Sequence, residues 1–391
     1  MPPVSSRPLV LALITFAGFI DTVAYSVAVP VLPDLMRTLG ASPTLVGLLF
    51  ASFGVTVLVV AIPMGAISDR VGRKGPLVWG LVGLSMATVA FAYAETVPAL
   101  FAARLAQGAA DAVTWVVGFA LLADLYEPSE RGKASGIVMA GASSAFVIGP
   151  SLGGWLYEIG GLRLPFLAVA AMAAAAAVVT AFLRLPDTHA SREPVPILSV
   201  LRVPAVRACA AAVALAAATM SMLEPVLALH LQALNVNPGR IGLVFGCAAL
   251  ATAVLHPMYG RLSDRVGARR LTLWGLAVSG GVMPLLGLIV SVESAIPIFI
   301  VQTAALALVI APSLAYMGEA TSSAGLGSFG VAYGLYNVAW GVGLLGGPAL
   351  GGFLFEQVGL ARLALWWAPA VLLLTILVAR ARDSARRAPS I

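Results

Sequence analysis

The stretch Gly65-Ala66-Ile67-Ser68-Asp69-Arg70-Val71-Gly72-Arg73-Lys74 places an acid, three bases and two glycines between two long apolar runs. A second stretch, Gly260-Arg261-Leu262-Ser263-Asp264-Arg265-Val266-Gly267-Ala268-Arg269-Arg270, repeats that pattern 195 positions later, about half the length of the 391-residue chain. Two copies of one polar loop at this spacing predict a chain built from two similar halves.

The composition indicates a membrane protein. Hydrophobic residues make up 60% of the chain, charged residues only 10%, and the mean hydropathy is +0.99. Soluble domains carry about 25% charged residues, so this chain could not hide its apolar surface from water. The net charge of +6 does not predict nucleic-acid binding, because the bases cluster in short loops beside apolar runs, as the positive-inside rule requires.

The apolar runs predict twelve membrane-spanning helices, since about 20 apolar residues cross a bilayer core. Residues 186–204, which are polar and rich in proline, read as a cytoplasmic linker between six-helix bundles at 1–185 and 205–380, followed by a basic tail at 381–391. The predicted spans are 8–33, 43–67, 76–94, 97–123, 134–157, 163–185, 205–233, 240–262, 271–291, 295–318, 328–355 and 361–380.

The distribution of lysine and arginine predicts the orientation. If the N-terminus is cytoplasmic, almost all of the loop bases face the cytoplasm, and the other side holds only Arg37, Arg163, Arg240 and Arg362. We therefore expect both termini in the cytoplasm of a multi-pass protein of the cell (inner) membrane.

Further repeats support the division into halves. Gly149-Pro150-Ser151-Leu152-Gly153-Gly154 recurs as Gly347-Pro348-Ala349-Leu350-Gly351-Gly352, and Pro30-Val31-Leu32 recurs as Pro225-Val226-Leu227. Their offsets, 198 and 195 residues, nearly equal that of the loops. The sequence thus predicts an all-α membrane protein of two pseudo-symmetric bundles related by an axis along the membrane normal.

With these motifs the chain resembles the major facilitator superfamily over nearly its whole length. The first loop matches that superfamily's G-x-x-x-D-R-x-G-R-K motif, and Arg104-Leu105-Ala106-Gln107-Gly108 is similar to the R-x-x-Q-G motif of proton-coupled members. The glycine-proline stretch from Gly149 is similar to an antiporter motif, and Pro30-x-x-Pro33 occurs in twelve-helix drug/proton antiporters. The resemblance implies the superfamily fold and transport by alternating access.

A narrower likeness is to vesicular amine transporters. It rests on Asp21, on Met222-Leu223-Glu224-Pro225 and on Glu130-Arg131-Gly132. Those transporters carry a lysine and two aspartates at positions that are here Phe53, Ile310 and Asn337. Their full charge network is therefore absent, and their amine specificity cannot be transferred directly.

Four ionisable side chains fall inside predicted spans, namely Asp21, Arg104, Asp111 and Glu224. Each would cost about 2.5–3.5 kcal/mol unpaired in the bilayer, so such residues must pair, line a wet cavity or take up protons. We expect all four to take part in proton coupling, although structural pairing is the alternative for each and the two roles are evenly balanced for Asp111.

Asp21 and Glu224 are the predicted substrate acids. Tyr25 lies four residues after Asp21 on the same helix face, and a carboxylate beside an aromatic ring suits a protonated amine. A helix-packing hydrogen bond is the other reading of Asp21. Glu224 precedes Pro225, which loosens its helix, and a buried carboxylate can hold a proton until water or a cation arrives; pairing with an arginine is its alternative.

Arg104 and Asp111 lie on one stripe of their helix, together with Gln107 and Gly108. Seven residues rise about 10 Å, too far for a direct bridge between them. Arg104 is expected to meet a carboxylate or carbonyl of another helix, with Asp21 as one candidate, and to tune the proton affinity of that acid.

Further along the chain, Tyr333, Tyr336, Asn337 and Trp340 share one helix face. Plain packing explains most aromatic stripes, but the amide within the membrane favours a cavity wall that binds substrate.

Two sets of residues are expected to serve the conformational cycle. Small residues let helices approach closely, and a loop carboxylate can face an arginine in one state and lose it in another. The glycine-rich set is Gly149, Pro150, Gly153 and Gly154; the loop set is Gly65, Asp69, Arg70, Gly72, Arg73, Asp264 and Arg265.

The predicted function is a proton-coupled antiporter that exports a cationic or amphipathic organic compound. A facilitator for a neutral metabolite such as a sugar, or a transport-dead membrane sensor, is the alternative. No nucleophile constellation, phosphate loop or metal cluster is evident in the sequence, so we expect no enzyme activity, cofactor or metal. The expected partners are protons, the organic cation and the lipid bilayer, with a monomer as the unit and no nucleic acid.

Overall fold

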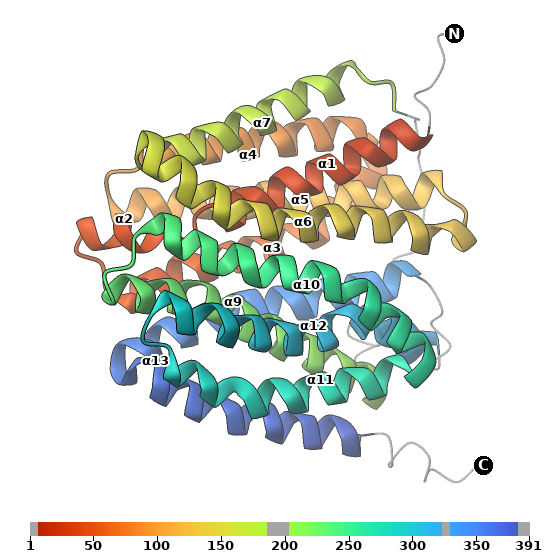
Figure 1. Ribbon diagram of the computed structural model, residues 1–391. Coiled ribbons are helices and arrows are strands. Elements are labelled where there is room, and N and C mark those ends of the chain that lie inside the picture. The colour runs from red at the N-terminus through yellow and green to blue at the C-terminus, as the bar shows by residue number, and fades with distance from the viewer. Residues whose placement is uncertain (1–6, 186–202, 323–328, 382–391) are drawn as a thin grey trace. The chain divides into compact units, whose positions relative to one another are not determined.

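The computed structural model describes residues 7–185, 203–322 and 329–381 (Figure 1). Within these ranges the chain is helical apart from short connections, and no strand occurs in them. Eleven of the described helices are long and apolar enough to cross a membrane. The prediction of an all-α membrane protein is confirmed.

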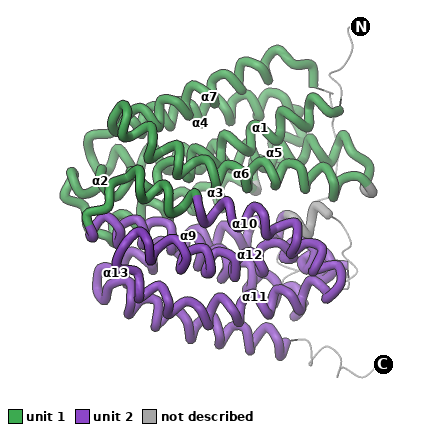
Figure 2. Tube along the Cα trace, viewed as in Figure 1, with its two compact units in different colours: residues 1–192, 235–246 green, residues 193–234, 247–391 purple. Residues whose placement is uncertain are grey.

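The first of two compact units comprises residues 1–192 and 235–246 (Figure 2). In this unit α1 packs against α6, α3 against α5, and α4 against both α5 and α7. Its helices are α1 (Arg7–Ser26), α2 (Leu32–Thr38), α3 (Pro43–Val71), α4 (Lys74–Ala92), α5 (Val97–Leu125), α6 (Pro128–Gly160) and α7 (Arg163–Phe182).

The second unit comprises residues 193–234 and 247–391 (Figure 2). Here α9 packs against α13 and α12, and α11 packs against α12 and α13. The elements are α9 (Pro204–Ala233), α10 (Pro238–Val266, whose first residues belong to the first unit), α11 (Ala268–Val282), the 3-10 helix η1 (Met283–Leu288), α12 (Val292–Ser322) and α13 (Phe329–Arg380).

Local sequence explains where several helices begin. Ser42 accepts a hydrogen bond from the Leu45 amide at the start of α3, and Thr96 does the same for the Ala99 amide at the start of α5. Each helix also has a proline in its first turn, where a backbone N–H would find no acceptor within the helix, so the missing N–H of proline costs no hydrogen bond. Both helices thus start where the predicted spans start.

The two polar loops turn at equivalent glycines. Gly72, between α3 and α4, has φ 85°, and Gly267, between α10 and α11, has φ 95°. Other L-residues rarely adopt this region. The repeat seen in the sequence is therefore also a repeat of backbone conformation.

The first predicted span, 8–33, is wrong in its extent. Helix α1 ends at Ser26, a turn follows, and α2 starts at Leu32. Pro30 and Pro33 supply no backbone N–H to continue a helix, so the chain breaks where the sequence analysis had continued it.

The last two predicted spans both lie in α13, which runs over 52 residues. Gly359, with φ 73° and ψ 175°, divides it into two helices. Counting α13 as two helices reconciles the eleven spans of the described residues with the twelve predicted apolar runs.

The predicted domain boundaries remain a prediction. Residues 186–202 of the linker and 382–391 of the tail lie outside the described residues. The division into compact units also groups residues 235–246 with the first half, whereas the sequence analysis had placed them in the second.

Candidate functional site

Two acids that the sequence singled out, on different helices of the first unit, lie together. Asp21 of α1 accepts a hydrogen bond from the indole Nε1 of Trp115 on α5, over 2.7 Å to its Oδ2. The carboxyl group of Asp111, also on α5, lies within hydrogen-bonding reach of both Asp21 and Trp115. Asp21 is only 1% exposed, and Asp111 is half-buried.

Arg104, on the same helix as Asp111, is fully buried. Its Nη1 donates to Oε1 of Gln107 over 3.1 Å, and the Gln107 amide donates to the Thr88 hydroxyl over 3.0 Å. The positive charge of Arg104 acts on the Asp111 carboxyl group. Asp21, Asp111 and Arg104, all within membrane-spanning helices, therefore form one electrostatic cluster.

Aromatic rings surround the Arg104 guanidinium. Its central carbon lies 4.9 Å from the centroid of Tyr25, and 5.2 Å from those of Phe50 and Phe53. Phe91 adds a fourth ring at 6.0 Å. Cation–π contacts of this kind hold a charge in a site without water.

This arrangement gives Tyr25 a different neighbour from the one expected. The sequence analysis paired its ring with a substrate cation, whereas the structure places the Arg104 guanidinium over it. Tyr25 is 6% exposed and also packs edge-on against Phe50, Phe53 and Phe146. In this structure the Tyr25 ring packs against the Arg104 guanidinium.

Glu224 belongs to the second unit. It lies within α9, is 6% exposed, and precedes Pro225 inside the helix. A proline inside a helix leaves one carbonyl without its usual amide partner. The structure thus places a buried acid at a local weakness of α9, as the sequence suggested.

The aromatic stripe of α13 is partly described. Tyr336 and Trp340 stack with centroids 6.0 Å apart, and the Ser313 hydroxyl of α12 lies 3.5 Å from the Tyr336 hydroxyl. Both rings pack against a buried cluster that includes Cys209 and Tyr316. Asn337 is half-buried. The side chain of Tyr333 lies outside the described part of the chain, so cavity lining stays a prediction for the whole stripe.

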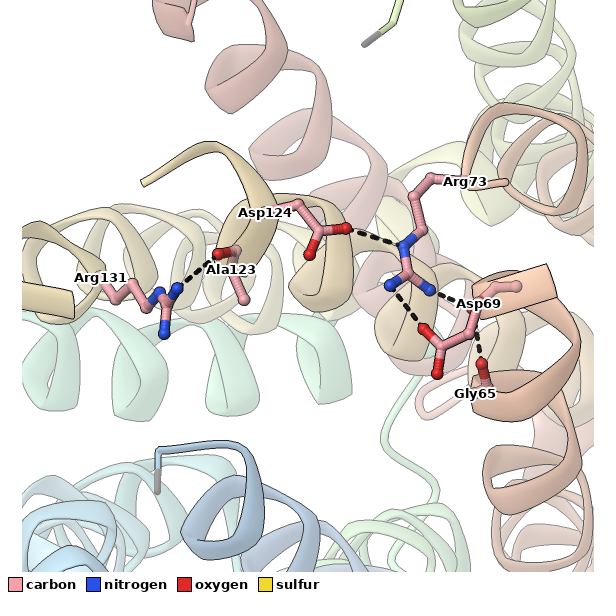
Figure 3. A network of polar contacts seen from close by, with 7 residues as sticks. Gly65, Asp69, Arg73, Ala123, Asp124 and Arg131 are labelled. Atoms are coloured by element: carbon pink, nitrogen blue, oxygen red, sulfur yellow. Dashed lines mark hydrogen bonds and ion pairs between the residues drawn. The ribbon is translucent and has the colours of Figure 1, made fainter. Parts of the chain in front are cut away.

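The first polar loop folds into a compact ionic network (Figure 3). Arg73 donates to Asp69 over 2.6 Å, to the Ser68 hydroxyl over 2.7 Å and, from Nε, to Asp124 of α5 over 3.0 Å. The side chains of Arg73 and Asp124 are 2% and 3% exposed. This network joins the α3–α4 loop to the end of α5.

A second arginine contacts the end of α5 in Figure 3. Arg131 of α6 donates from Nη2 to the carbonyl of Ala123 over 2.8 Å and from Nε to that of Tyr126 over 3.0 Å. These are carbonyls that a helix end leaves without amide partners. Arg70, by contrast, is exposed, and Gly65 accepts from Ser68 through its carbonyl.

The second polar loop lacks this network because Ala268 stands at the position of Arg73. Asp264 and Arg265 are exposed. Arg269, the next residue, instead donates to the carbonyls of Val378 and Ala379 near the end of α13, over 3.2 and 2.8 Å. The two loops share a backbone turn and differ in their ionic contacts.

The glycine-rich stretches allow close helix contacts inside each half. A Cβ on Gly149 would lie 2.0 Å from the Ser26 hydroxyl oxygen, and a Cβ on Gly153 would lie 2.4 Å from the Val27 carbonyl oxygen. Both would collide. Pro150 lies inside α6, and Gly154 faces the backbone of Pro238 and Gly239, which belong to the same unit. Equivalent contacts in the second unit join Gly347 and Gly351 to α9.

Two contacts of the site were missed in the sequence. Neither Trp115 nor Asp124 is among the predicted site residues, although each contacts one that is. A signal existed for Asp124, because Glu319 stands 195 positions later, at the offset of the loops. Gln107 and Gln302 share that offset as well, so reading the repeat at every polar position would have found them.

Comparison with known proteins identifies the family. The model of the Major Facilitator Superfamily matches residues 14–208 and again 209–390. The chain belongs to this superfamily. The two successive matches correspond to the two halves that the loops and glycine stretches predicted.

Its relatives include vesicular transporters. The chain is 30% identical over 409 residues to a "Probable vesicular acetylcholine transporter-B" of Danio rerio, covering 95% of this chain and 80% of that protein. It is 27% identical over 320 residues to the "Chromaffin granule amine transporter" of Homo sapiens, covering 81% and 61%. The likeness to vesicular amine transporters drawn from the sequence is confirmed.

Solved structures show the same fold. A bacterial homologue of the human lysosomal transporter Spinster, in an inward-facing and occupied conformation, superposes with a TM-score of 0.79 at 17% identity, over 98% of each chain. The protein is therefore a multi-pass membrane transporter of the superfamily, and its charged cluster lies on that scaffold.

Proposed function

We propose that this protein is a proton-coupled antiporter that exports an organic cation, or an amphipathic compound carrying a positive charge. The observation that carries the proposal is the cluster of Asp21, Asp111 and Arg104 inside membrane-spanning helices of one unit. Buried charges at such depth are costly and mark ion or substrate pathways by default. Amine and acetylcholine transporters among the relatives support a cationic substrate.

The proposed exchange is a competition for the carboxyl groups. On the proton-rich side they take up protons, and the transporter then exposes them to the cytoplasm. The organic cation displaces the protons there, and the return step carries it out. Glu224 serves in the same exchange as a second proton or cation site, and the loop and glycine motifs set the balance between conformations.

The positive-inside distribution of the bases supports cytoplasmic termini and the cell membrane as the location. In that orientation the inward-directed proton gradient across the cell (inner) membrane drives export. The monomer is the proposed transporting unit.

The test is uptake of fluorescent organic cations by everted membrane vesicles energised with a proton gradient. Asp21→Asn and Glu224→Gln should each abolish gradient-driven uptake, and Arg104→Ala should remove its dependence on pH. Glu95→Gln is a matched control, because the Glu95 side chain is 85% exposed. Normal proton-driven uptake by the Asp21→Asn protein, or competition by sugars and not by cations, would contradict the proposal.

A further inference from the structure

The contacts of the Asp21 carboxylate carry a statement about substrate class. We propose that Asp21 and Asp111 act as one dicarboxyl unit that holds a single proton and exchanges it for one ammonium group bearing at least one N–H. The substrate is then a protonated primary, secondary or tertiary amine, and not a quaternary ammonium ion. This inference rests on the proposed function and specifies the chemistry of its site.

The first step is the geometry of the pair. Asp21 on α1 and Asp111 on α5 lie within hydrogen-bonding reach of each other, and the Trp115 indole fixes Oδ2 of Asp21 from one side. Two carboxyl groups can hydrogen-bond to each other only when one carries the proton, because a carboxylate is solely an acceptor. Two charged carboxylates at this distance would repel each other strongly.

The second step is the balance of charge. The charges of Asp21 and Arg104 both act on the Asp111 carboxyl group. The helices packed against α1 and α5 carry their described charged side chains near their ends: α3 at Asp69 and Arg70, α4 at Lys74, α6 at Glu130, Arg131, Lys133 and Glu158, and α7 at Arg163. One guanidinium and two carboxyl groups sharing one proton are neutral together. When the proton leaves for water, one monovalent cation restores neutrality, so the exchange at this unit is one proton for one cation.

The third step is the unsatisfied acceptor. Oδ1 of Asp21 is buried and, apart from the proton shared with Asp111, has no hydrogen-bond donor in the described structure. A buried carboxylate oxygen without a donor is costly, and an ammonium N–H removes that cost with a charge-assisted hydrogen bond. A quaternary ammonium presents only methyl or methylene groups and leaves the oxygen unsatisfied.

The surroundings fit an amine with an apolar body. Trp115 stacks on Phe119, with centroids 5.7 Å apart and planes within 14°. The half-buried Asp111 is the more exposed member of the pair. Among its relatives, this requirement groups the chain with a protein named for amines and separates it from one named for acetylcholine, which is a quaternary ion.

The first experiment needs no ligand. Infrared difference spectra of the purified full-length protein at neutral pH should show a protonated carboxylic acid band, and Asp21→Asn and Asp111→Asn should each remove that same band. Either variant leaves a single acid near Arg104, with no partner to share its proton. Glu95→Gln should leave the band intact. Absence of the band from the unsubstituted protein, or its survival in the Asp111→Asn protein alone, would overturn the shared proton.

The second experiment uses matched probes, N,N-dimethylphenethylamine and phenethyltrimethylammonium, with calorimetry in buffers of different ionisation enthalpy. The tertiary amine should release one proton on binding, and the quaternary ion should bind about tenfold more weakly or worse, as expected for one lost charge-assisted hydrogen bond. Equal affinities, or binding of the amine without proton release, would overturn the inference. If no pair in a wider panel of tertiary and quaternary cations binds, the proposed function itself fails.

A positioning role for Trp115 is tested in the same assay. Trp115→Phe keeps a ring against Phe119 but removes the indole N–H that fixes Asp21. The pH profile of amine binding should shift while thermal unfolding stays close to that of the unsubstituted protein. An unchanged pH profile would show that Trp115 only packs.

Discussion

The two halves share a scaffold but differ in where they hold charge. Gly80 packs against Val113 and Thr114 on the next helix, and Gly275 makes the same contacts with Leu308 and Val309, 195 positions later. The first half adds Arg73 at its loop and Arg104 in its core, where the second has Ala268 and Phe299. The repeat thus preserves the helix packing, whereas these two arginines are present in the first half and replaced in the second.

The core shows this difference most clearly at two glutamines. Gln107 accepts from Arg104 and donates to Thr88, so both ends of its amide are satisfied. Gln302, its counterpart, donates to Ser279 over 2.8 Å, but its Oε1 is buried without a partner in the described structure. The second half thus has the glutamine at this position but Phe299 in place of the arginine.

The largest expected effect is at the loops. Arg73→Ala strands the buried Asp124 carboxylate and should destabilise the protein by about 3–5 kcal/mol. Arg269→Ala, the matched change in the second half, removes partly exposed bonds to two carbonyls and should cost about 1 kcal/mol. Thermal unfolding in detergent micelles measures both.

A double variant sharpens that comparison. Asp124→Asn added to Arg73→Ala removes the stranded charge, so it should recover part of the lost stability. Equal losses for Arg73→Ala and Arg269→Ala, or no recovery in the double variant, would show that the ionic network does not distinguish the halves.

A smaller effect is expected at the glycines. A methyl group on Gly153 would lie 2.4 Å from the Val27 carbonyl, which is backbone, whereas on Gly351 it would lie 2.2 Å from Cγ of Met222, a flexible side chain. Gly153→Ala should cost about 1–3 kcal/mol, and Gly351→Ala less than about 1 kcal/mol, because methionine can move aside. A larger loss of stability for Gly351→Ala than for Gly153→Ala would mean that the backbone at Val27 moves aside more readily than Met222 of α9.

The smallest effect is expected at the glutamines. Gln107→Leu removes the hydrogen bond from Arg104 and the one to Thr88, so it should lower the stability by about 1–2 kcal/mol. Gln302→Leu removes an amide that already has an unsatisfied oxygen, so its cost should be near zero. A large loss for Gln302→Leu would indicate that a bound water or ligand satisfies Oε1 in solution.

Much of the fold could be predicted because its determinants are local. Apolar runs of membrane length, proline and glycine at helix ends, and the repeat offset fixed the spans and the two halves. The error in the first span also has a local cause, since the prolines at 30 and 33 ended the first helix early; Gly359, by contrast, separates the last two helices where the sequence predicted a break. The likeness to vesicular transporters followed from motifs and was confirmed by comparison.

The candidate site could be predicted only in part. Spacing along α5 indicated that Arg104 and Asp111 share a stripe, but the partner of each lies on another helix. Asp21 was one candidate partner of Arg104, and the structure places Trp115 and Asp111 among the contacts of Asp21. The ring of Tyr25 lies against the Arg104 guanidinium, a contact that the sequence did not indicate, and its role in substrate binding stays a prediction.

By itself, the sequence determined that this is a repeated, all-helical membrane transporter with a few buried charges, because hydropathy and helix periodicity act between residues close in the chain. Only the tertiary structure decided which charges meet. The packing of α1 on α5 brings Asp21 to Asp111, and that of α3 on α5 helps bring rings around Arg104. Contacts between helices depend on their rotation and depth in the bundle, which spacing within one helix does not specify.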